Sequence, residues 1–239
     1  MPEFLAFRLA ATMGSFGVAA GNFSRGTEAV PGHSLVVGLI GAALGLERED
    51  ERLLSLSDGL RIALAMESRG APLRDFHTVQ SRRERRGPPP RTRKATLEDA
   101  EPYTTLSERD YYCDVVVTVA VARQAGPFTL ADMCEALLRP RFTLYLGRKS
   151  CPLAAPPHPL VIEAERAADA LVDYRKRTEN LRSMFPIVWR DTLAAIADAR
   201  LDPANNGRRS RRRTLPGARS TWSYRLLEEL TLDARSEKP

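Results

Sequence analysis

The stretch Tyr111-Tyr-Cys-Asp-Val-Val-Val-Thr-Val-Ala-Val-Ala122 contains the clearest secondary-structure signal in the chain. Valine, threonine and tyrosine are the residues that pack best on a pleated surface, so residues 111–122 predict a buried β-strand. Successive side chains of a strand point to opposite faces, which separates Tyr111 from Tyr112. We expect one of these rings in the core and the other exposed, where it can stack on a ligand.

The segments on either side of this strand predict an alternating order of strands and helices. Before it, residues 3–10 and 60–66 alternate like strands, and residues 35–46 form an apolar helix with Ser34 as its N-cap. After it, Thr129 caps a helix over residues 130–138, and residues 142–146 read as a last strand. The order strand, helix, strand, insertion, strand, helix, strand is that of the split βαβ, or ferredoxin-like, class of α+β folds.

Two regions depart from this pattern. Residues 82–93 are basic and include the run Gly87-Pro-Pro-Pro90, which predicts an exposed arm or a disordered linker. Beyond Pro152 the periodicity weakens. Residues 163–177 favour a helix, residues 205–213 a polar loop with five arginines, and residues 222–230 either a strand or a helix.

The composition points to a globular protein with a polyanionic partner. The chain has 239 residues, of which 43% are hydrophobic, and a net charge of +6. That size and apolar content suffice for a buried core, and an arginine-rich excess of positive charge favours nucleic acid. The three cysteines are widely spaced and form no metal or disulfide pattern, which indicates a cytoplasmic protein. We find neither a secretory leader nor a membrane-spanning run in the sequence.

The first candidate site is the basic turn Gly147-Arg-Lys-Ser150, which directly follows the apolar residues 142–146. Glycine lets the backbone come close to a ligand, arginine offers a planar fork of donors, and lysine adds a point charge. Such a turn can hold phosphates, although a solvated loop has the same composition.

A second candidate lies in Leu73-Arg-Asp-Phe-His-Thr78. Arg74 and Phe76 suit the clasping and stacking of single-stranded RNA, while His77 could instead act as a general acid or base. Ser34, at the start of an apolar helix, suits an anion site or a plain helix cap. We find none of the P-loop, GxSxG, HExxH or paired-carboxylate signatures of enzymes, so we expect no cofactor and no metal site.

Several ordered blocks of the chain resemble one known family. They are FLAFRLA, Arg25-Gly-Thr27, Pro31 with Ser34, LGLERED, LRDFHTV, ERDYYCD and RPRFTLYLGRKSCPL, the last being the most specific. Together they make residues 3–153 similar to the fifth Cas family of RAMP-type CRISPR-associated proteins, in its type I-E form.

The resemblance implies a ferredoxin-like (RRM-like) RAMP palm over residues 1–153, with a β-hairpin thumb inserted at about residues 80–108 and a smaller C-terminal accessory region over residues 154–239. It implies a non-catalytic subunit that caps the 5′ handle of CRISPR RNA within Cascade. Its partners would be the CasC-type backbone, the large subunit, the CasE-type endoribonuclease and target DNA. The expected RNA contacts are Arg25, Ser34, Arg48, Arg74, Phe76, His77, Arg109, Tyr145, Arg148 and Lys149.

The chain also departs from the family pattern. Ala29 stands where the family commonly has arginine, and the family's usual Pro-Thr-Arg-Ser is here Pro31-Gly-His-Ser34. These changes affect the RNA contacts expected at Ala29 and Gly32, and His33 is the residue that could replace the family arginine, with less charge. Two alternatives stay open. In type I-C systems a similar protein cuts the repeat RNA itself, which would make this chain a metal-independent endoribonuclease. A generic RNA-binding module outside CRISPR defence is the other.

Overall fold

A computed structural model describes residues 1–18, 23–81, 91–97, 103–184, 193–203, 205, 207–217 and 223–234. The strands are β1 Glu3–Gly14, β2 Ser24–Arg25, β3 Leu60–Ser68, β4 Ala71–Ser81, β5 Tyr103–Arg123, β6 Leu160–Glu163, β7 Leu193–Asp198, β8 Arg209–Pro216 and β9 Tyr224–Ala234. The α-helices are α1 His33–Leu44, α2 Arg52–Gly59, α3 Arg93–Leu97, α4 Leu130–Leu138 and α5 Ala167–Arg177, and short 3-10 helices cover Glu179–Met184 and Ala199–Leu201.

One large sheet organises the molecule, in the order β6-β1-β5-β3-β7-β9-β8. Neighbouring strands along this order run antiparallel, and within the described residues only the two-residue β2 pairs with β5 in parallel. The valine-rich residues of β5 lie between β1 and β3, where both edges of the strand are paired. The expected strands 3–10, 60–66 and 111–122 are therefore confirmed, and the fold is mixed, with a mainly antiparallel sheet.

The two faces of the sheet bury different side chains because neighbouring residues of a strand point in opposite directions. Leu5, Phe7 and Leu9 of β1 belong to a core shared with α1, α2 and α4. Phe4 and Ala6 belong to a second core beneath α5, in which alanines predominate. Small side chains let α5 lie close to the sheet, so both faces are covered by helices.

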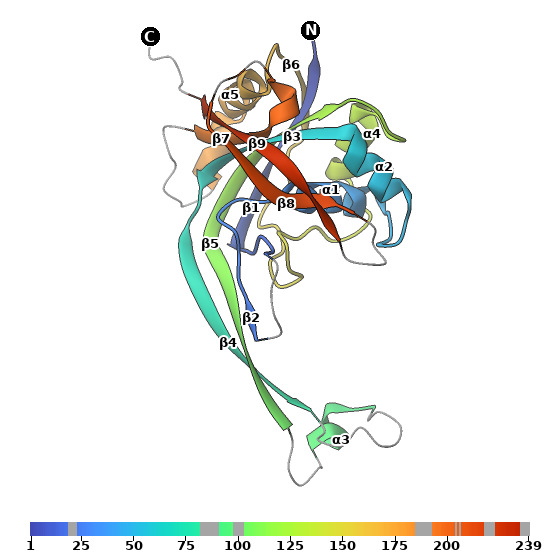
Figure 1. The fold of residues 1–239 in the computed structure, drawn as a ribbon, viewed down its shortest axis with the longest axis vertical. Coiled ribbons are helices and arrows are strands. Elements are labelled where there is room, and N and C mark those ends of the chain that lie inside the picture. Colours follow the sequence, from blue (N-terminus) through green and yellow to red (C-terminus); the bar gives the residue numbers. More distant parts are fainter. Residues whose placement is uncertain are drawn as a thin grey trace.

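A long hairpin leaves the sheet as a direct extension of its central strands (Figure 1). After an irregularity between Met66 and Ser68, β4 continues along β5 from the pair Ala71–Cys113 to the pair Ser81–Tyr103. Gly70 makes the bend possible with a φ of 67°, because a Cβ there would lie 1.4 Å from the carbonyl oxygen of Cys113. The boundaries 80 and 108 expected for a thumb lie inside this hairpin, and residues 82–90 and 98–102 of its tip lie outside the described residues.

Three local predictions are wrong. Residues 142–146 form no strand, because Leu146 N–H donates to the carbonyl of Cys151 (2.7 Å) and folds the segment back on itself. Instead β6 pairs with the outer edge of β1. Most of the arginine-rich segment 205–213 is strand rather than loop, because β8 pairs with β9. The N-cap of α1 is Gly32, not Ser34, and no side chain caps this helix.

The C-terminal region shares the sheet with the rest of the chain. β6 extends one edge, and β7, β9 and β8 extend the other, so residues from the region 154–239 flank β1 and β3 on both sides. The segment 222–230, for which strand and helix were both open, contributes the strand β9. The expected helix over residues 163–177 is α5, which begins at Ala167.

Candidate nucleic-acid interface

The basic turn is held rigidly against the end of β1. Ser15 N–H donates to the carbonyl of Leu146 (3.0 Å), and Cys151 N–H donates to the carbonyl of Arg148 (2.8 Å). Gly147 has a φ of 95°, and a Cβ there would lie 1.7 Å from the Ser15 carbonyl oxygen. Gly147 is therefore needed for a close approach to the protein's own backbone, which differs from the ligand contact that its position in the turn predicted.

Arg148 is the cation of this turn that contacts both β5 and β2. Its guanidinium lies over the ring of Tyr111, with 4.6 Å from Cζ to the ring centroid. Its Nη2 donates to the carbonyl of Arg25 (2.8 Å), while its buried Nη1 has no hydrogen-bond partner among the described residues. Arg148 thus joins the turn to β2 and to the root of the hairpin.

Arg25 and Arg109 are direct partners in the β2–β5 pairing and so share one face of the sheet. Like charges directly opposite each other on paired strands repel, and an anion would relieve that repulsion. The buried Nε of Arg109 also has no hydrogen-bond partner within the described part of the chain. Together with Arg148 and the exposed Lys149, these arginines form a group that we call the basic junction (Arg25, Arg109, Arg148 and Lys149).

The predicted hairpin residues divide between its two faces. Arg74 lies opposite Asp110, and its Nε and Nη2 donate to the two carboxylate oxygens at 2.8 and 3.2 Å. This hydrogen bonding lowers the pKa of Asp110 and raises that of Arg74. Phe76 follows on the same strand face and is 62% exposed. Arg74 therefore already has a carboxylate partner, and Phe76 is free to stack.

His77 points away from Phe76, because consecutive residues of a strand alternate. Its Nδ1 lies 3.2 Å from Oδ2 of Asp75, and both side chains are about half exposed. The Asp75 carboxylate can orient the imidazole, and both the binding role and the acid–base role of His77 stay predictions.

The remaining predicted residues lie around the junction or apart from it. Tyr145 is half-buried at the base of the basic turn, where it bridges to Pro152. Ser34 lies in the first turn of α1, next to β8: a Cβ on Gly32 would come within 2.2 Å of Thr214 Oγ1. Arg48 is exposed in the connection between α1 and α2, rather than on the turn or the hairpin.

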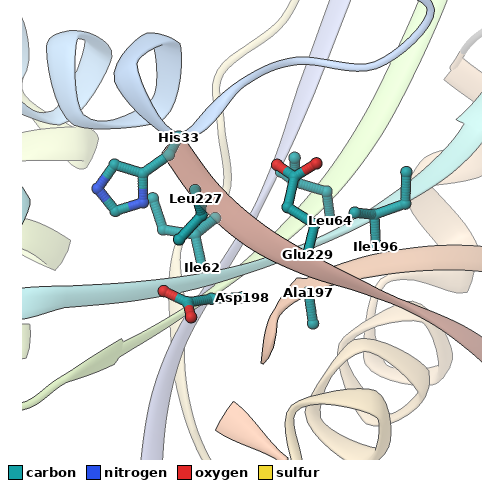
Figure 2. A pocket seen from close by; sticks show the side chains of 8 residues that line it. All are labelled: His33, Ile62, Leu64, Ile196, Ala197, Asp198, Leu227 and Glu229. Carbon is teal, nitrogen blue, oxygen red and sulfur yellow. The ribbon is translucent and has the colours of Figure 1, made fainter. Parts of the chain in front are cut away.

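His33 cannot supply the charge that the family pattern would place there. It is buried, and Figure 2 shows it reaching from the start of α1 into a small pocket that Asp198 and Glu229 also line. Its Nε2 lies 3.1 Å from the carbonyl oxygen and 3.2 Å from the hydroxyl oxygen of Ser57. Burial lowers its pKa from 6.5 to about 4, so the ring is neutral at pH 7. The expectation that His33 replaces an RNA-binding arginine is therefore wrong.

Sequence reasoning missed the aromatic support of the basic turn. Tyr111 is 5% exposed, which confirms that one of the two neighbouring tyrosines is in the core. Tyr112 is not the exposed ring that we expected: it is half-buried and stacks near Phe16, with 6.5 Å between ring centroids. The blocks ERDYYCD and LGRKS each carry a signal, but nothing in the sequence shows that they touch.

Neither a metal site nor a membrane span emerges from the residues that the structure describes. No group of three or more His, Cys, Asp or Glu side chains is positioned to hold a metal ion among these residues. Within the same ranges, no helix has the length and apolar character needed to cross a membrane.

Comparison with known proteins identifies the family. Residues 4–226 match the family model described as "CRISPR-associated protein (Cas_Cas5)". The chain is 35% identical over 188 residues to the "CRISPR system Cascade subunit CasD" of Escherichia coli K12, an alignment that covers 73% of this chain and 78% of the relative.

Two solved structures have a similar fold. A chain of a "CRISPR RNA-guided surveillance complex" superposes with a TM-score of 0.62 at 22% identity, covering 96% of this chain and 89% of the other. A second, described as "Crystal structure of Cas protein", has a TM-score of 0.58 at 23% identity and covers 99% of both chains. The chain belongs to the Cas5 family of CRISPR-associated proteins.

Proposed function

We propose that this protein is a non-catalytic, cytoplasmic subunit of a type I-E Cascade complex, and that it binds and caps the 5′ handle of CRISPR RNA. The E. coli relative, named as a Cascade subunit, supports the assignment to that complex. The likeness to a chain of an RNA-guided surveillance complex is consistent with it. In this proposal the protein itself binds CRISPR RNA. The assembled complex recruits the target DNA, and its role is antiviral defence.

The observation that carries the proposal is the basic junction. Arg25 and Arg109 are forced side by side by strand pairing, and Arg148 is fixed beside them by Tyr111. Two of these arginines keep a buried N–H without a partner among the described residues. Guanidinium groups bind phosphates with paired, charge-assisted hydrogen bonds, so an RNA phosphate suits this position.

We also propose that the palm is ferredoxin-like, of the RAMP type. The order β6-β1-β5-β3 corresponds to the fourth, first, third and second strands of a split βαβ unit, with every neighbouring pair antiparallel. In this interpretation the β4–β5 hairpin is the thumb, and β7, β8 and β9 are an accessory addition to the second strand.

The hairpin supplies the surface for the rest of the complex. It exposes large apolar side chains, including Phe76 (62% exposed), Tyr103 (59%) and Leu106 (43%). Exposed apolar groups on a projecting hairpin are typical of a surface that packs against a partner or stacks on bases. We assign it to handle bases and to the backbone and large subunits.

The test is binding of handle RNA by the full chain, with the double substitution Arg148→Ala and Lys149→Ala. Each lost phosphate contact lowers the salt dependence of single-strand binding by a slope of about 0.7. We expect a clear loss of affinity and a slope lower by about 1.4 for two contacts. Arg139→Ala with Arg166→Ala is the matched control, because both arginines are exposed and pair with acids elsewhere.

An unchanged affinity and slope in the Arg148/Lys149 variant would overturn the proposed RNA site. Cleavage is measured in the same samples with labelled repeat RNA, and we expect none. Specific cleavage that is abolished by His77→Ala would instead place the protein among the endoribonucleases.

A further inference from the structure

The arginine-rich strand β8 is the last strand of the sheet, beside β9. Its side chains alternate between the two faces of the sheet. Arg209, Arg211 and Arg213 pair with Leu230, Glu228 and Leu226 of β9, so all six side chains share one face. The three arginines, which we call the arginine ladder, are exposed and stand about 6.7 Å apart along the strand.

Arg212, which lies between Arg211 and Arg213 in the sequence, has a structural role. It points to the opposite face, where it pairs with Glu229 (2.7 Å) and donates to the carbonyls of Val30 (2.7 Å) and Pro31 (2.9 Å). These bonds tie β8 to the start of α1. Arg209 also contacts the protein, because its Nη2 donates to the carbonyls of Pro203 (3.0 Å) and Asn205 (3.2 Å), but its side chain stays exposed like those of Arg211 and Arg213.

The ladder carries more positive charge than its neighbours compensate. Glu228 is shared, at 3.2 Å from Arg209 and 3.8 Å from Arg211. Arg213 has no ion-pair partner among the residues described. Three cations beside a single carboxylate make a surface suited to a polyanion.

Exposed apolar and aromatic groups accompany these charges. Leu226 is 57% exposed and Tyr224 45%, and both lie on the ladder face, since Tyr224 pairs with Pro216 and Leu226 with Arg213. The second core ends at Leu230, which is fully buried with the α5 side of the sheet. An open strand pair with alternating arginines and a tyrosine fits the sugar–phosphate backbone and stacking bases of a single strand.

The ladder and the basic junction lie on opposite faces of the sheet. Tyr111, beneath Arg148, belongs to the core on the α1 face, together with Val115 and Val117. Leu230, on the ladder face, belongs to the core beneath α5. A strand held at the basic junction therefore leaves the ladder open for a different strand or a distant segment.

We propose that the outer face of β8–β9, formed by Arg209, Arg211, Arg213, Tyr224 and Leu226, is a second binding surface for single-stranded nucleic acid. It goes beyond handle binding, because it uses other residues on the other face of the sheet. The competing explanation is that charges on an edge strand only prevent edge-to-edge association.

The test measures binding of an oligothymidylate of about 15 nucleotides to the full chain, in the range of single-strand site sizes. The variant Arg209→Ser, Arg211→Ser, Arg213→Ser should bind at least about tenfold more weakly, with a salt slope lower by about 2 for three phosphates. The matched control, Arg52→Ser, Arg139→Ser, Arg166→Ser, removes the same charge from arginines paired with Asp50, Glu135 and Asp169. It should bind like the wild type.

Further variants separate charge, stacking and folding. Replacing the three ladder arginines with lysine should restore most of the affinity, because lysine keeps the charge. Tyr224→Ser with Leu226→Ser should weaken binding without changing the salt slope, since stacking is not a counterion effect. If the serine variant does not fold, these two variants decide the question.

The proposal is overturned if the ladder and control variants bind equally, or if polyglutamate displaces the oligonucleotide as efficiently as unlabelled oligothymidylate does. The latter result would assign the face to an acidic protein. Arg148→Ala with Lys149→Ala should leave oligothymidylate binding at the ladder in place. The proposed handle site and the proposed ladder site can therefore be disproved independently of each other.

Discussion

Arg148 shows how one residue links structure and recognition. Its guanidinium stacks on Tyr111 and bonds to the carbonyl of Arg25, so the same group that would meet a phosphate also holds the turn to β2. Lys149, its neighbour, is exposed. The two cations of the turn should therefore differ in what they contribute to stability.

Substitution of Arg148 by alanine should lower the free energy of unfolding by about 1–2 kcal/mol, through the lost cation–π contact and hydrogen bond. Lys149→Ala should leave it within about 0.5 kcal/mol, as is usual for an exposed site. Urea unfolding at pH 7 measures both. Equal effects of the two substitutions would show that Arg148 contributes nothing to the turn's attachment.

Because His33 is buried, we expect the free energy of unfolding to depend on pH. Its pKa is about 4 in the folded protein and 6.5 in the ordinary state, because burial disfavours the charged ring. The unfolded chain therefore binds the proton first as the pH falls. The stability contribution of neutral His33 is complete above pH 6.5 and is lost towards pH 4, by about 3 kcal/mol in the limit.

The measurement compares urea unfolding of the wild type and His33→Gln at pH 7 and pH 5. The wild type should lose more stability than the variant over this interval, by about 2 kcal/mol. The comparison uses the change in each protein's free energy of unfolding between pH 7 and pH 5. A loss of stability that the substitution causes at pH 7 therefore does not affect it. Parallel pH profiles would show that His33 is not the group responsible.

At the scale of elements, the β4–β5 hairpin depends on its own pairing as well as on the sheet. Its two strands stay in register from Ala71–Cys113 to Ser81–Tyr103, and the cross-strand pair Arg74–Asp110 lies within that ladder. Its root is continuous with β3 and the buried half of β5. The paired arms should therefore form without the tip.

Replacing residues 82–102 by Asn-Gly, a two-residue type I′ turn, tests this prediction. The variant should unfold at the same temperature as the wild type within a few degrees. Amide protons of residues 104–112 should stay protected in hydrogen exchange, because their ladder partners remain. Loss of protection throughout the arms would contradict the prediction and show that the tip holds the hairpin together.

For the molecule as a whole, residues 1–153 and residues 154–239 contribute strands to one sheet, so we expect them to unfold as one unit. β6 covers the free edge of β1, and β7 covers that of β3. Tyr174 and Leu171 of α5 are fully buried against the alanine-rich face of the sheet. Residues 1–153 alone would expose both edges and this apolar face.

A fragment of residues 1–153 should therefore fail to unfold cooperatively and should aggregate, since open edges and uncovered apolar faces both promote association. Heat denaturation followed by circular dichroism, with size-exclusion chromatography, measures this against the full chain. A monomeric fragment with a sharp transition would show instead that residues 1–153 are an independent domain.

Those parts of the protein that depend on local pattern could be predicted from the amino-acid sequence. Alternation and β-branched residues located β1, β3 and β5, and capping residues located α4, whose Thr129 and Asp132 cap each other reciprocally. The blocks around Arg25, Arg109 and Arg148 were sufficient to indicate the family, which the comparisons confirmed. Each of these signals involves residues close together in the sequence. It can therefore be recognised without knowing which distant segment packs against it.

Which of these residues act together depends instead on how distant segments of the chain pack. The contact of Arg148 with Tyr111 joins residues 37 positions apart, and that with Arg25 joins residues 123 positions apart. The burial of His33, the strand character of the arginine tract and the addition of β7–β9 to the sheet depend on packing that no local pattern encodes. Residue propensity specifies which segments become strands or helices. Which charged residues pair, and which face of a strand is exposed, depends on the distant strand that lies beside it.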